Sequence, residues 1–363
     1  MNKEPLISLT KRKNMEWYKA WGVRILCIVI AIILCGVLTT LLTGLNPISV
    51  YSVMLKGAFS TARRRWALFQ STAILLCISL ALTPAFKMRF WNVGGEGQVL
   101  MGCLGASACM ITLGGKVSNP ILYILMIVSS LFLGALWGFL PAFFGAKYNT
   151  NATLFTLMMN YIATQIVAYF IILWENPKGS AHIGVINQKT HAGWLPKIGG
   201  SEYLLSIIVA GVLVVFMYIY LNYTKHGYEI SVVGESVRTA KYVGINVKKV
   251  TLRTMILSGA ICGLTGLILS GNINHTLTTT IVSGRGFTAV MVSWMAQFNP
   301  IIMAFVSFLV SLLSKGASEI STTFNLSQDY GDILTGIIIF FIIGSEFFVH
   351  YKVHLHLGKK KEE

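Results

Sequence analysis

Apolar runs of about twenty residues recur along this chain, separated by short polar segments, and a helix of that length crosses the hydrocarbon core of a bilayer. Of the 363 residues, 55% are hydrophobic and only 12% are charged. Soluble domains carry about 25% charged residues because their surface faces water. A chain this poor in charge cannot cover itself for water, so we expect its outer surface to face lipid.

The runs predict an all-α membrane protein of about ten transmembrane helices in one compact bundle. One run, 286–298, is too short to cross a bilayer at about 1.5 Å of rise per residue, so protein must fill the membrane beside it. A half-apolar stretch, 46–60, is expected to lie along the outer interface. The predicted spans cover residues 21–43, 66–86, 98–113, 120–144, 152–174, 203–223, 255–270, 286–298, 301–313 and 333–348.

Positive charge is concentrated at the chain ends and in connecting segments such as 225–253, and the formal net charge is +16. Cytoplasmic loops of membrane proteins keep an excess of Lys and Arg. We therefore expect a cytoplasmic N-terminal segment (1–20), a transmembrane domain (21–350) with a cytoplasmic segment at 224–253, and a cytoplasmic basic tail (351–363). Three consecutive arginines at 63–65 would lie outside, against this bias, which leaves the topology of the first hairpin open.

Several classes of partner are excluded by the same patterns. No basic face of a soluble fold is available, so nucleic acid is not expected as a partner, whereas membrane lipid is. The six cysteines lie in apolar stretches without a C-x-x-C pair. No histidine cluster has ligand spacing. The sequence therefore predicts neither a metal nor a cofactor.

The segment 90–98 interrupts the apolar pattern with glycines and with the polar side chains of Asn92, Glu96 and Gln98. In lipid, free backbone groups and an ionisable carboxylate are tolerated only against protein or a wet cavity. Two interpretations stay open. Either these residues line a substrate pathway, or Glu96 and Gln98 cap the helix that follows them.

A second glycine-interrupted helix start, at 284–288, contains Phe287 and precedes the short run. Each half of the chain thus has a full span followed by a break, and we expect the halves to run in opposite directions. Inverted repeats with paired broken helices are a transporter design in which the breaks line the pathway. Asn160 and Trp294, inside apolar runs, are further pathway candidates, with helix-to-helix adhesion as the alternative.

The basic segment contains a short helix-like run that ends at a glycine. A plain charged loop has no use for the apolar side chains of Tyr242, Val243 and Ile245 beside Gly244. An exposed helix with an apolar edge is better explained by a partner that covers it. The candidate docking residues are Glu235, Arg238, Tyr242, Gly244, Ile245 and Asn246.

Two of these segments resemble signatures of the permease family shared by ABC importers of simple sugars, branched-chain amino acids and nucleosides. Residues 91–98, WNVGGEGQ, are similar to the family's FNIGxEGQ, and residues 234–246, GESVRTAKYVGIN, are similar to its GENxxAAxYxGIN. The run 156–162, TLMMNYI, looks closest to the nucleoside branch, which works with a BMP-type lipoprotein. Two departures are Thr239 in place of alanine and NAT at 151–153, where that branch tends to show NEV.

The resemblance implies a ten-helix permease like that of vitamin B12-type importers, located in the bacterial plasma membrane. It also implies three partners: a second related permease in a heterodimer, a cytoplasmic ABC ATPase and an extracytoplasmic substrate-binding lipoprotein. The segment around Gly244 resembles the coupling helix that docks into the ATPase. The sequence contains no G-x-x-x-x-G-K-[ST] loop for ATP phosphates. The chain is therefore not expected to be an enzyme.

The sequence thus favours a nucleoside permease that alternates access while its partners hydrolyse ATP. One alternative is a permease for a simple sugar such as ribose. Another is a transporter driven by an ion gradient, a class that usually has several coupled carboxylates in the membrane, whereas Glu96 is nearly alone in the central spans. A membrane enzyme would need convergent catalytic groups, and Glu96, Asp329 and Asp332 lie far apart in the sequence.

Overall fold

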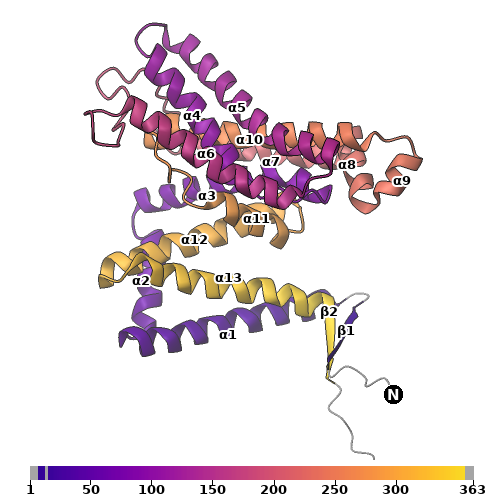
Figure 1. Ribbon diagram of the computed structural model, residues 1–363. Coiled ribbons are helices and arrows are strands. Elements are labelled where there is room, and N and C mark those ends of the chain that lie inside the picture. The colour runs from indigo at the N-terminus through magenta and orange to yellow at the C-terminus, as the bar shows by residue number, and fades with distance from the viewer. Residues whose placement is uncertain (1–6, 13–14, 356–363) are drawn as a thin grey trace, which may run out of the picture. The chain divides into compact units, whose positions relative to one another are not determined.

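The computed structural model describes residues 7–12 and 15–355, and these form two compact units (Figure 1). One unit combines Met1–Arg65 with Leu312–Glu363, and the other is Trp66–Ser311. Within the described residues, nine helices are long and apolar enough to cross a membrane. The prediction of a helical protein with many membrane spans is therefore confirmed.

The unit built from the two ends of the chain rests on α1 packed against α13. The hydroxyl of Tyr330 in α13 donates a hydrogen bond of 2.6 Å to Oγ1 of Thr39 in α1. Two short strands that the sequence did not predict pair antiparallel next to these helices. The elements are β1 (Ile7–Lys11), α1 (Trp17–Thr43), α2 (Pro47–Phe59), α13 (Gln328–His350) and β2 (Tyr351–Leu355).

The arginine cluster at 63–65 has local partners inside this unit. Arg64 forms an ion pair of 2.8 Å with Glu319 and donates a hydrogen bond of 3.1 Å to Ser60. Arg65 donates to the backbone carbonyl of Phe59 at 3.4 Å. These contacts explain how arginines are accommodated at this position, whichever side of the membrane it faces.

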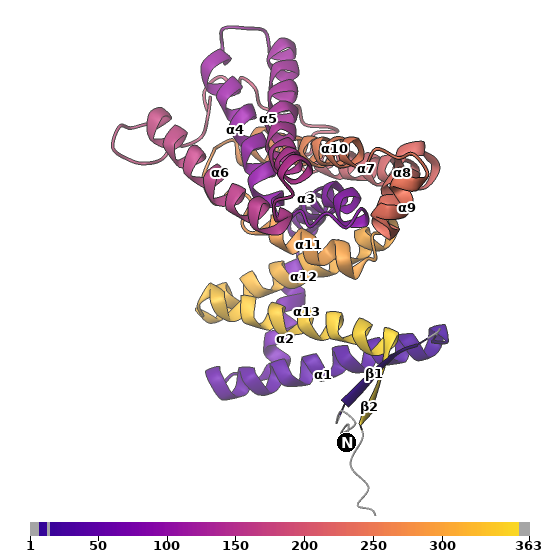
Figure 2. The same ribbon diagram turned by 45° about the vertical axis from the view of Figure 1, so that its right-hand side comes forward.

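The other unit contains the remaining helices, and its α4 and α5 run side by side (Figures 1 and 2). Helices α3 and α12 each extend from this unit into the first. The elements are α3 (Ala62–Lys87), α4 (Gly95–Leu113), α5 (Asn119–Tyr148), α6 (Ala152–Trp174), α7 (Leu204–Tyr223), α8 (Lys225–Glu235), α9 (Val237–Tyr242), α10 (Val247–Ile268), the π-helix η1 (Leu269–Asn274), α11 (Arg285–Met295) and α12 (Pro300–Phe324).

The core of this second unit is a close packing of α4, α5 and α10 through small residues. A Cβ at Gly102 of α4 would lie 2.5 Å from the Cα of Gly263 in α10. A Cβ at Gly134 of α5 would lie 2.7 Å from that same Cα. Lipid gives no hydrophobic drive between helices, so membrane helices associate through such close backbone contacts. This packing fixes α4, whose first turn carries the predicted site.

Two predicted helix boundaries were wrong because charged residues were taken for loop. Helix α10 begins at Val247 rather than at 255, since Asn246 caps it by accepting a hydrogen bond of 3.1 Å from the backbone N–H of Lys249. Helix α12 continues to Phe324 rather than ending at 313. The span 152–174 coincides with α6, and the short run predicted at 286–298 is α11.

Candidate functional site

The two glycine-broken helix starts lie against each other in the second unit. Helix α4 begins at Gly95 and α11 at Arg285. The carboxylate of Glu96, in the first turn of α4, accepts hydrogen bonds from the backbone N–H groups of Gly284 (2.9 Å) and Gly286 (2.7 Å). The first N–H groups of a helix lack partners and carry partial positive charge, so a carboxylate stabilises them. Glu96 therefore caps α11 rather than the helix that carries it.

Glycine is required where α11 starts. A Cβ at Gly286 would lie 2.6 Å from the Cα of Glu96, closer than side chains approach. Gly284 has a φ of +71°, a left-handed conformation that glycine adopts without strain. These two glycines allow α11 to start directly against the backbone of α4. The sequence predicted both breaks but not that they meet.

A buried polar cluster holds the turn before α4. Oδ1 of Asn92 accepts hydrogen bonds from the backbone N–H of Gly94 (3.0 Å) and from Nε2 of Gln98 (3.3 Å). Nδ2 of Asn92 donates to Oγ of Ser258 in α10 at 3.3 Å. Because Asn92 and Gln98 are almost completely buried, their contacts here are with protein, and they fix the turn against α10.

Helix α6 fastens the same turn from another side. The amide of Asn160 accepts a hydrogen bond of 2.8 Å from the N–H of Gly97 and donates one of 3.0 Å to the carbonyl of Val93. Thr156, one turn earlier, accepts a hydrogen bond of 3.1 Å from the N–H of Val93. Both ends of the Asn160 amide are thus occupied by backbone. This geometry agrees with the adhesive role that the sequence left open.

The aromatic candidates are more exposed than the polar ones. Phe287 of α11 is 41% exposed and Trp294 is 44% exposed. The indole of Trp294 stacks on that of Trp91, with ring centroids 5.1 Å apart and planes inclined by 22°. Sequence reasoning placed Trp91 inside a signature but did not single it out. Only the fold brings these two tryptophans together.

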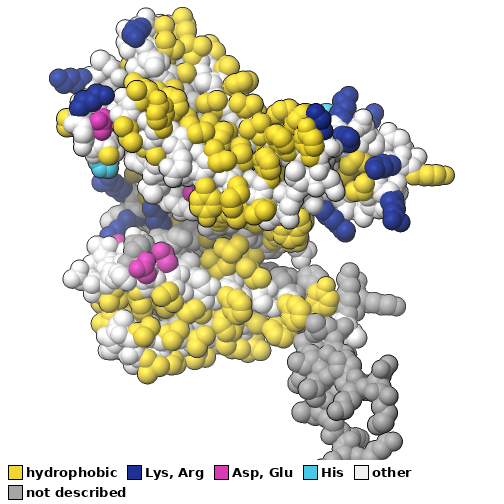
Figure 3. Space-filling model, viewed as in Figure 1, with side chains coloured by type: hydrophobic (Ala, Val, Ile, Leu, Met, Phe, Trp, Pro, Cys, Tyr) yellow, Lys and Arg dark blue, Asp and Glu magenta, His cyan; other side chains and the backbone are white. Residues whose placement is uncertain are grey.

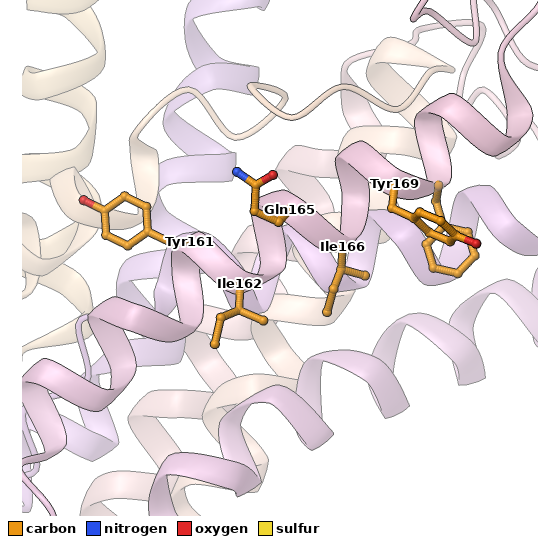
Figure 4. A pocket seen from close by; sticks show the side chains of 6 residues that line it. Tyr161, Ile162, Gln165, Ile166 and Tyr169 are labelled. Atoms are coloured by element: carbon orange, nitrogen blue, oxygen red, sulfur yellow. The ribbon is translucent and has the colours of Figure 1, made fainter.

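One face of α6 carries polar side chains that the other described residues leave uncovered. Tyr161 and Tyr169 are both more than 60% exposed, and Gln165 between them is also exposed. With Ile162 and Ile166 they line a groove of about 530 Å³ (Figure 4). Residues at i, i+4 and i+8 share a helix face, and this spacing is the signal that sequence reasoning missed.

The basic segment forms the short helices α8 and α9 and the start of α10. Positive side chains gather over α8 and α9 (Figure 3). Ser236 caps α9 by accepting a hydrogen bond of 3.2 Å from the N–H of Thr239. Tyr242, at the end of α9, is 92% exposed. Gly244 has a φ of +80° and turns the chain back toward α10. Candidate docking residues that lie exposed are Glu235, Arg238, Tyr242, Gly244 and Asn246, while Ile245 is half-buried.

The polar groups at the starts of α4 and α11 hold these helices in position. The carboxylate of Glu96 and the amides of Asn92 and Asn160 are engaged by protein groups. Among residues 7–12 and 15–355, no group of three or more His, Cys, Asp or Glu side chains is placed to hold a metal. We call the contact between the starts of α4 and α11 the joint. The exposed groups considered below are the aromatic side chains near this joint, the polar face of α6 and the basic segment.

Residues 66–343 match the family model described as the permease component of branched-chain amino acid transport systems. A guanosine ABC transporter permease protein of Bacillus subtilis is 28% identical, with 92% of this chain and 96% of the relative aligned. A nucleoside ABC transporter permease protein of Lactococcus lactis is 26% identical over 85% of this chain and 87% of its own. A glucose ABC transporter permease protein of Haloferax volcanii is 23% identical over 98% and 95%.

Proposed function

Because the chain belongs to the family of permease components of branched-chain amino acid transport systems, we propose that it is the membrane-spanning permease of an ATP-driven nucleoside importer. Two similar permeases are named for guanosine and for nucleosides, and they align with 92% and 85% of this chain. The family match also includes both glycine-broken helix starts and the basic segment. A nucleoside contains a flat aromatic base, which suits a route bordered by exposed indole and phenyl groups.

The observation that carries the proposal is the joint between α4 and α11. Paired broken helices mark the substrate route of transporters, because irregular backbone in a membrane needs protein or water beside it. Glu96 ties these two helix starts into one unit. In the proposal, Asn92, Gln98 and Asn160 hold this unit in place. Phe287, exposed beside it on α11, faces the route together with Trp294.

The energy for transport comes from another polypeptide in this proposal. Exposed apolar side chains at Val237, Tyr242 and Val243 stand among exposed basic ones on and beside α9. A rigid helix with such a surface is suited to docking on a cytoplasmic ATPase and transmitting its closure to α10, which starts directly after it. The chain itself then acts as a permease and not as an enzyme.

A second related permease completes the route. A glutamine and two tyrosines on an exposed helix face are unfavourable against acyl chains, and such groups usually face a protein partner or a water-filled cavity. The face of α6 that carries Gln165 meets this description. A second permease across this face would enclose a pathway between the two subunits. We propose a heterodimer of related permeases.

The orientation follows from charge. With the basic segment inside the cell, the six long helices that precede it return the N-terminal segment to the cytoplasmic side of a bacterial plasma membrane. Strand β2 near the C-terminus pairs with β1 near the N-terminus, so both end segments lie on that side in the proposal. The loop between α6 and α7 then lies outside, where a substrate-binding lipoprotein delivers its cargo. Asn187 holds this loop in place by donating hydrogen bonds to the carbonyl of Met110 in α4 (2.8 Å) and to that of Ala192 in the loop itself (2.9 Å). A preformed loop is suited to receiving a partner.

A simple sugar is the second candidate cargo. The glucose permease of Haloferax volcanii aligns with 98% of this chain, more than the two nucleoside-type permeases do. A pentose presents the same kind of hydroxyl groups as the ribose of a nucleoside. An ion-gradient transporter finds less support, because Glu96 is tied to backbone N–H groups.

Uptake of labelled guanosine and uridine by cells that lack other nucleoside importers tests the cargo. Deletion of this gene is expected to abolish guanosine uptake, and the restored gene should return it, while uridine shows whether pyrimidine nucleosides share the route. Labelled ribose and glucose are measured in parallel. Unchanged nucleoside uptake after deletion contradicts the proposal, and loss of sugar uptake alone would select the second candidate.

A further inference from the structure

A small aromatic pocket with one arginine lies where α3 ends. Phe86, Arg89, Trp91 and Trp294 line a pocket of about 190 Å³. The ring of Phe86 is buried and meets Trp294 edge-on, with centroids 6.0 Å apart. The two stacked indoles remain 48% and 44% exposed. The pocket therefore offers an apolar wall with flat aromatic surface still open to a ligand.

Arg89 supplies the polar group of this pocket. It is exposed and has a φ of +60° at the turn that ends α3. Within the described part of the chain, no carboxylate forms an ion pair with it. A guanidinium has five N–H donors in a planar fork and no acceptor. It therefore selects ligand edges that present two acceptors side by side.

The pocket lies at the end of the second unit where the basic segment packs. Gly234 of α8 lies so close to the carbonyl of Lys87 that a Cβ would overlap it. Oγ1 of Thr251 in α10 lies 3.8 Å from the sulfur of Met88. The pocket is thus next to the proposed docking element and to the joint held by Asn92.

We propose that this pocket is a binding site for a nucleobase with a carbonyl oxygen beside a ring nitrogen acceptor, such as guanine or hypoxanthine. The base stacks on the exposed indole surface, a contact that every base can make through its π-face. Arg89 reads O6 and N7 of the base with two parallel hydrogen bonds, the geometry by which arginine distinguishes guanine. Adenine presents a donor at the same edge and fits less well. This inference rests on the proposed nucleoside function and adds the class of base to it.

Equilibrium binding of labelled guanosine to the assembled transporter in lipid nanodiscs, without lipoprotein, tests the site. Inosine should displace guanosine well, adenosine poorly and ribose not at all. Trp91→Ala is expected to weaken guanosine binding about tenfold, in line with the loss of one stacking contact. Arg89→Gln should lower the guanosine-to-adenosine affinity ratio about tenfold, because a glutamine amide matches adenine.

Two further variants separate binding from folding. Trp66→Ala removes a similarly exposed tryptophan at the other end of α3 and should leave binding unchanged. Trp91→Phe keeps an aromatic face and should retain most of the affinity. If Trp91→Ala and Arg89→Gln bind guanosine like the unaltered protein, or if that protein binds none without lipoprotein, the base site is wrong. Cells that still take up guanosine in that case leave the nucleoside function standing, whereas absence of uptake in cells with the unaltered gene would overturn the function itself.

Discussion

At the scale of single residues, Glu96 is the group on which the joint between α4 and α11 depends. Its two oxygens accept from two backbone N–H groups at the start of α11, and among the residues that the structure describes no other side chain caps that helix. Hydrogen bonds to a charged acceptor contribute about 1.5–3 kcal/mol each, more than neutral ones. The carboxylate thus joins the two halves of the chain, because Glu96 and Gly284 are 188 residues apart in the sequence.

Glu96→Gln is expected to lower transport more than it lowers the amount of protein in the membrane. The amide keeps one acceptor and turns a donor toward an N–H, so one bond is lost at a cost of about 1–3 kcal/mol. Uptake per unit of membrane protein, with immunoblots and a melting temperature in detergent, measures both effects. Glu16→Gln, which alters an exposed ion pair with Lys19, is the control. Equal losses of uptake and protein would show that Glu96 only holds the fold.

Glu175 makes a second carboxylate contact, in the loop after α6. It accepts hydrogen bonds from the N–H groups of Gly179 (2.7 Å) and Ala181 (3.0 Å). These bonds, the one from Gly179 first, lower the pKa of Glu175 below its ordinary value of 4.5. Because the folded-state pKa is the lower one, the contact stabilises the loop above that value and is lost as the pH falls through the folded pKa.

Hydrogen exchange at the amides of Gly179 and Ala181 is expected to quicken as the pH drops below about 4.5, after correction for intrinsic exchange. In Glu175→Gln, a side chain that does not titrate, the same amides should exchange independently of pH across this window. The comparison needs only the purified protein in detergent. A pH dependence that persists in the glutamine variant would assign the effect to another group.

At the scale of elements, the segment from α8 to the start of α10 is a helix–turn–helix connection whose turn depends on Gly244. That residue has a φ of +80°, and no heavy atom lies within 4 Å of a Cβ built there. A side chain would therefore act through backbone strain and not through a clash. A left-handed conformation costs an ordinary residue about 1–2 kcal/mol, enough to redirect the connection without unfolding the spans.

Gly244→Val is expected to leave the protein in the membrane while substrate-stimulated ATP hydrolysis and uptake fall together. Gly44→Val is a matched control, since Gly44 has a φ of +68° and equally open space but lies at the end of α1, away from the basic segment in the sequence. Membrane amount, ATPase rate and uptake are measured for both variants. Normal stimulation and transport in Gly244→Val would refute the coupling role, as would photocrosslinks from Tyr242 that never reach an ATPase subunit.

Local patterns allowed most helices to be predicted, since a span needs a long apolar run whatever its neighbours are. The run 152–174 matched α6 at both ends. The predicted boundaries were wrong where a helix continues from apolar residues into polar and charged ones. Helix α12 carries Glu319 beyond its apolar part, and this charge is compensated by Arg64 from a distant segment. The pairing of β1 with β2 is likewise non-local. Both strands do alternate apolar and polar residues, as ISLTK and YKVHL, but five residues in a basic terminal segment were too short a pattern to indicate a partner.

The candidate site shows the same limit more sharply. The glycine breaks were visible because glycine and carboxylate are unusual within apolar sequence. The hydrogen-bond partner of Glu96 could not be predicted, because the start of α4 and the start of α11 both offer free backbone N–H groups. The stack of Trp91 on Trp294 also joins segments from opposite halves. The polar face of α6 had a readable spacing, but a single glutamine and two tyrosines within an apolar span resemble ordinary helix adhesion.

At the scale of the whole molecule, two spans of the second unit present different exposed faces. The exposed face of α7 is largely apolar, with Ile208, Val212 and Phe216 among its side chains. The exposed face of α6 carries Gln165 between two tyrosines. Hydrocarbon accepts the first face and disfavours the second. Lipid can therefore cover the exposed face of α7, whereas the exposed face of α6 needs a polar or protein neighbour.

Photocrosslinking at these two faces tests whether a second permease covers α6. Benzoylphenylalanine in place of Gln165 is expected to give a protein adduct as heavy as two permeases, because the face lies at a subunit boundary. The same group in place of Val212, 62% exposed on α7, should give lipid adducts only. Expression of this chain alone and together with its candidate partner distinguishes a homodimer from a heterodimer. If position 165 yields only lipid adducts, as position 212 is expected to, then α6 faces the bilayer and the second permease binds elsewhere.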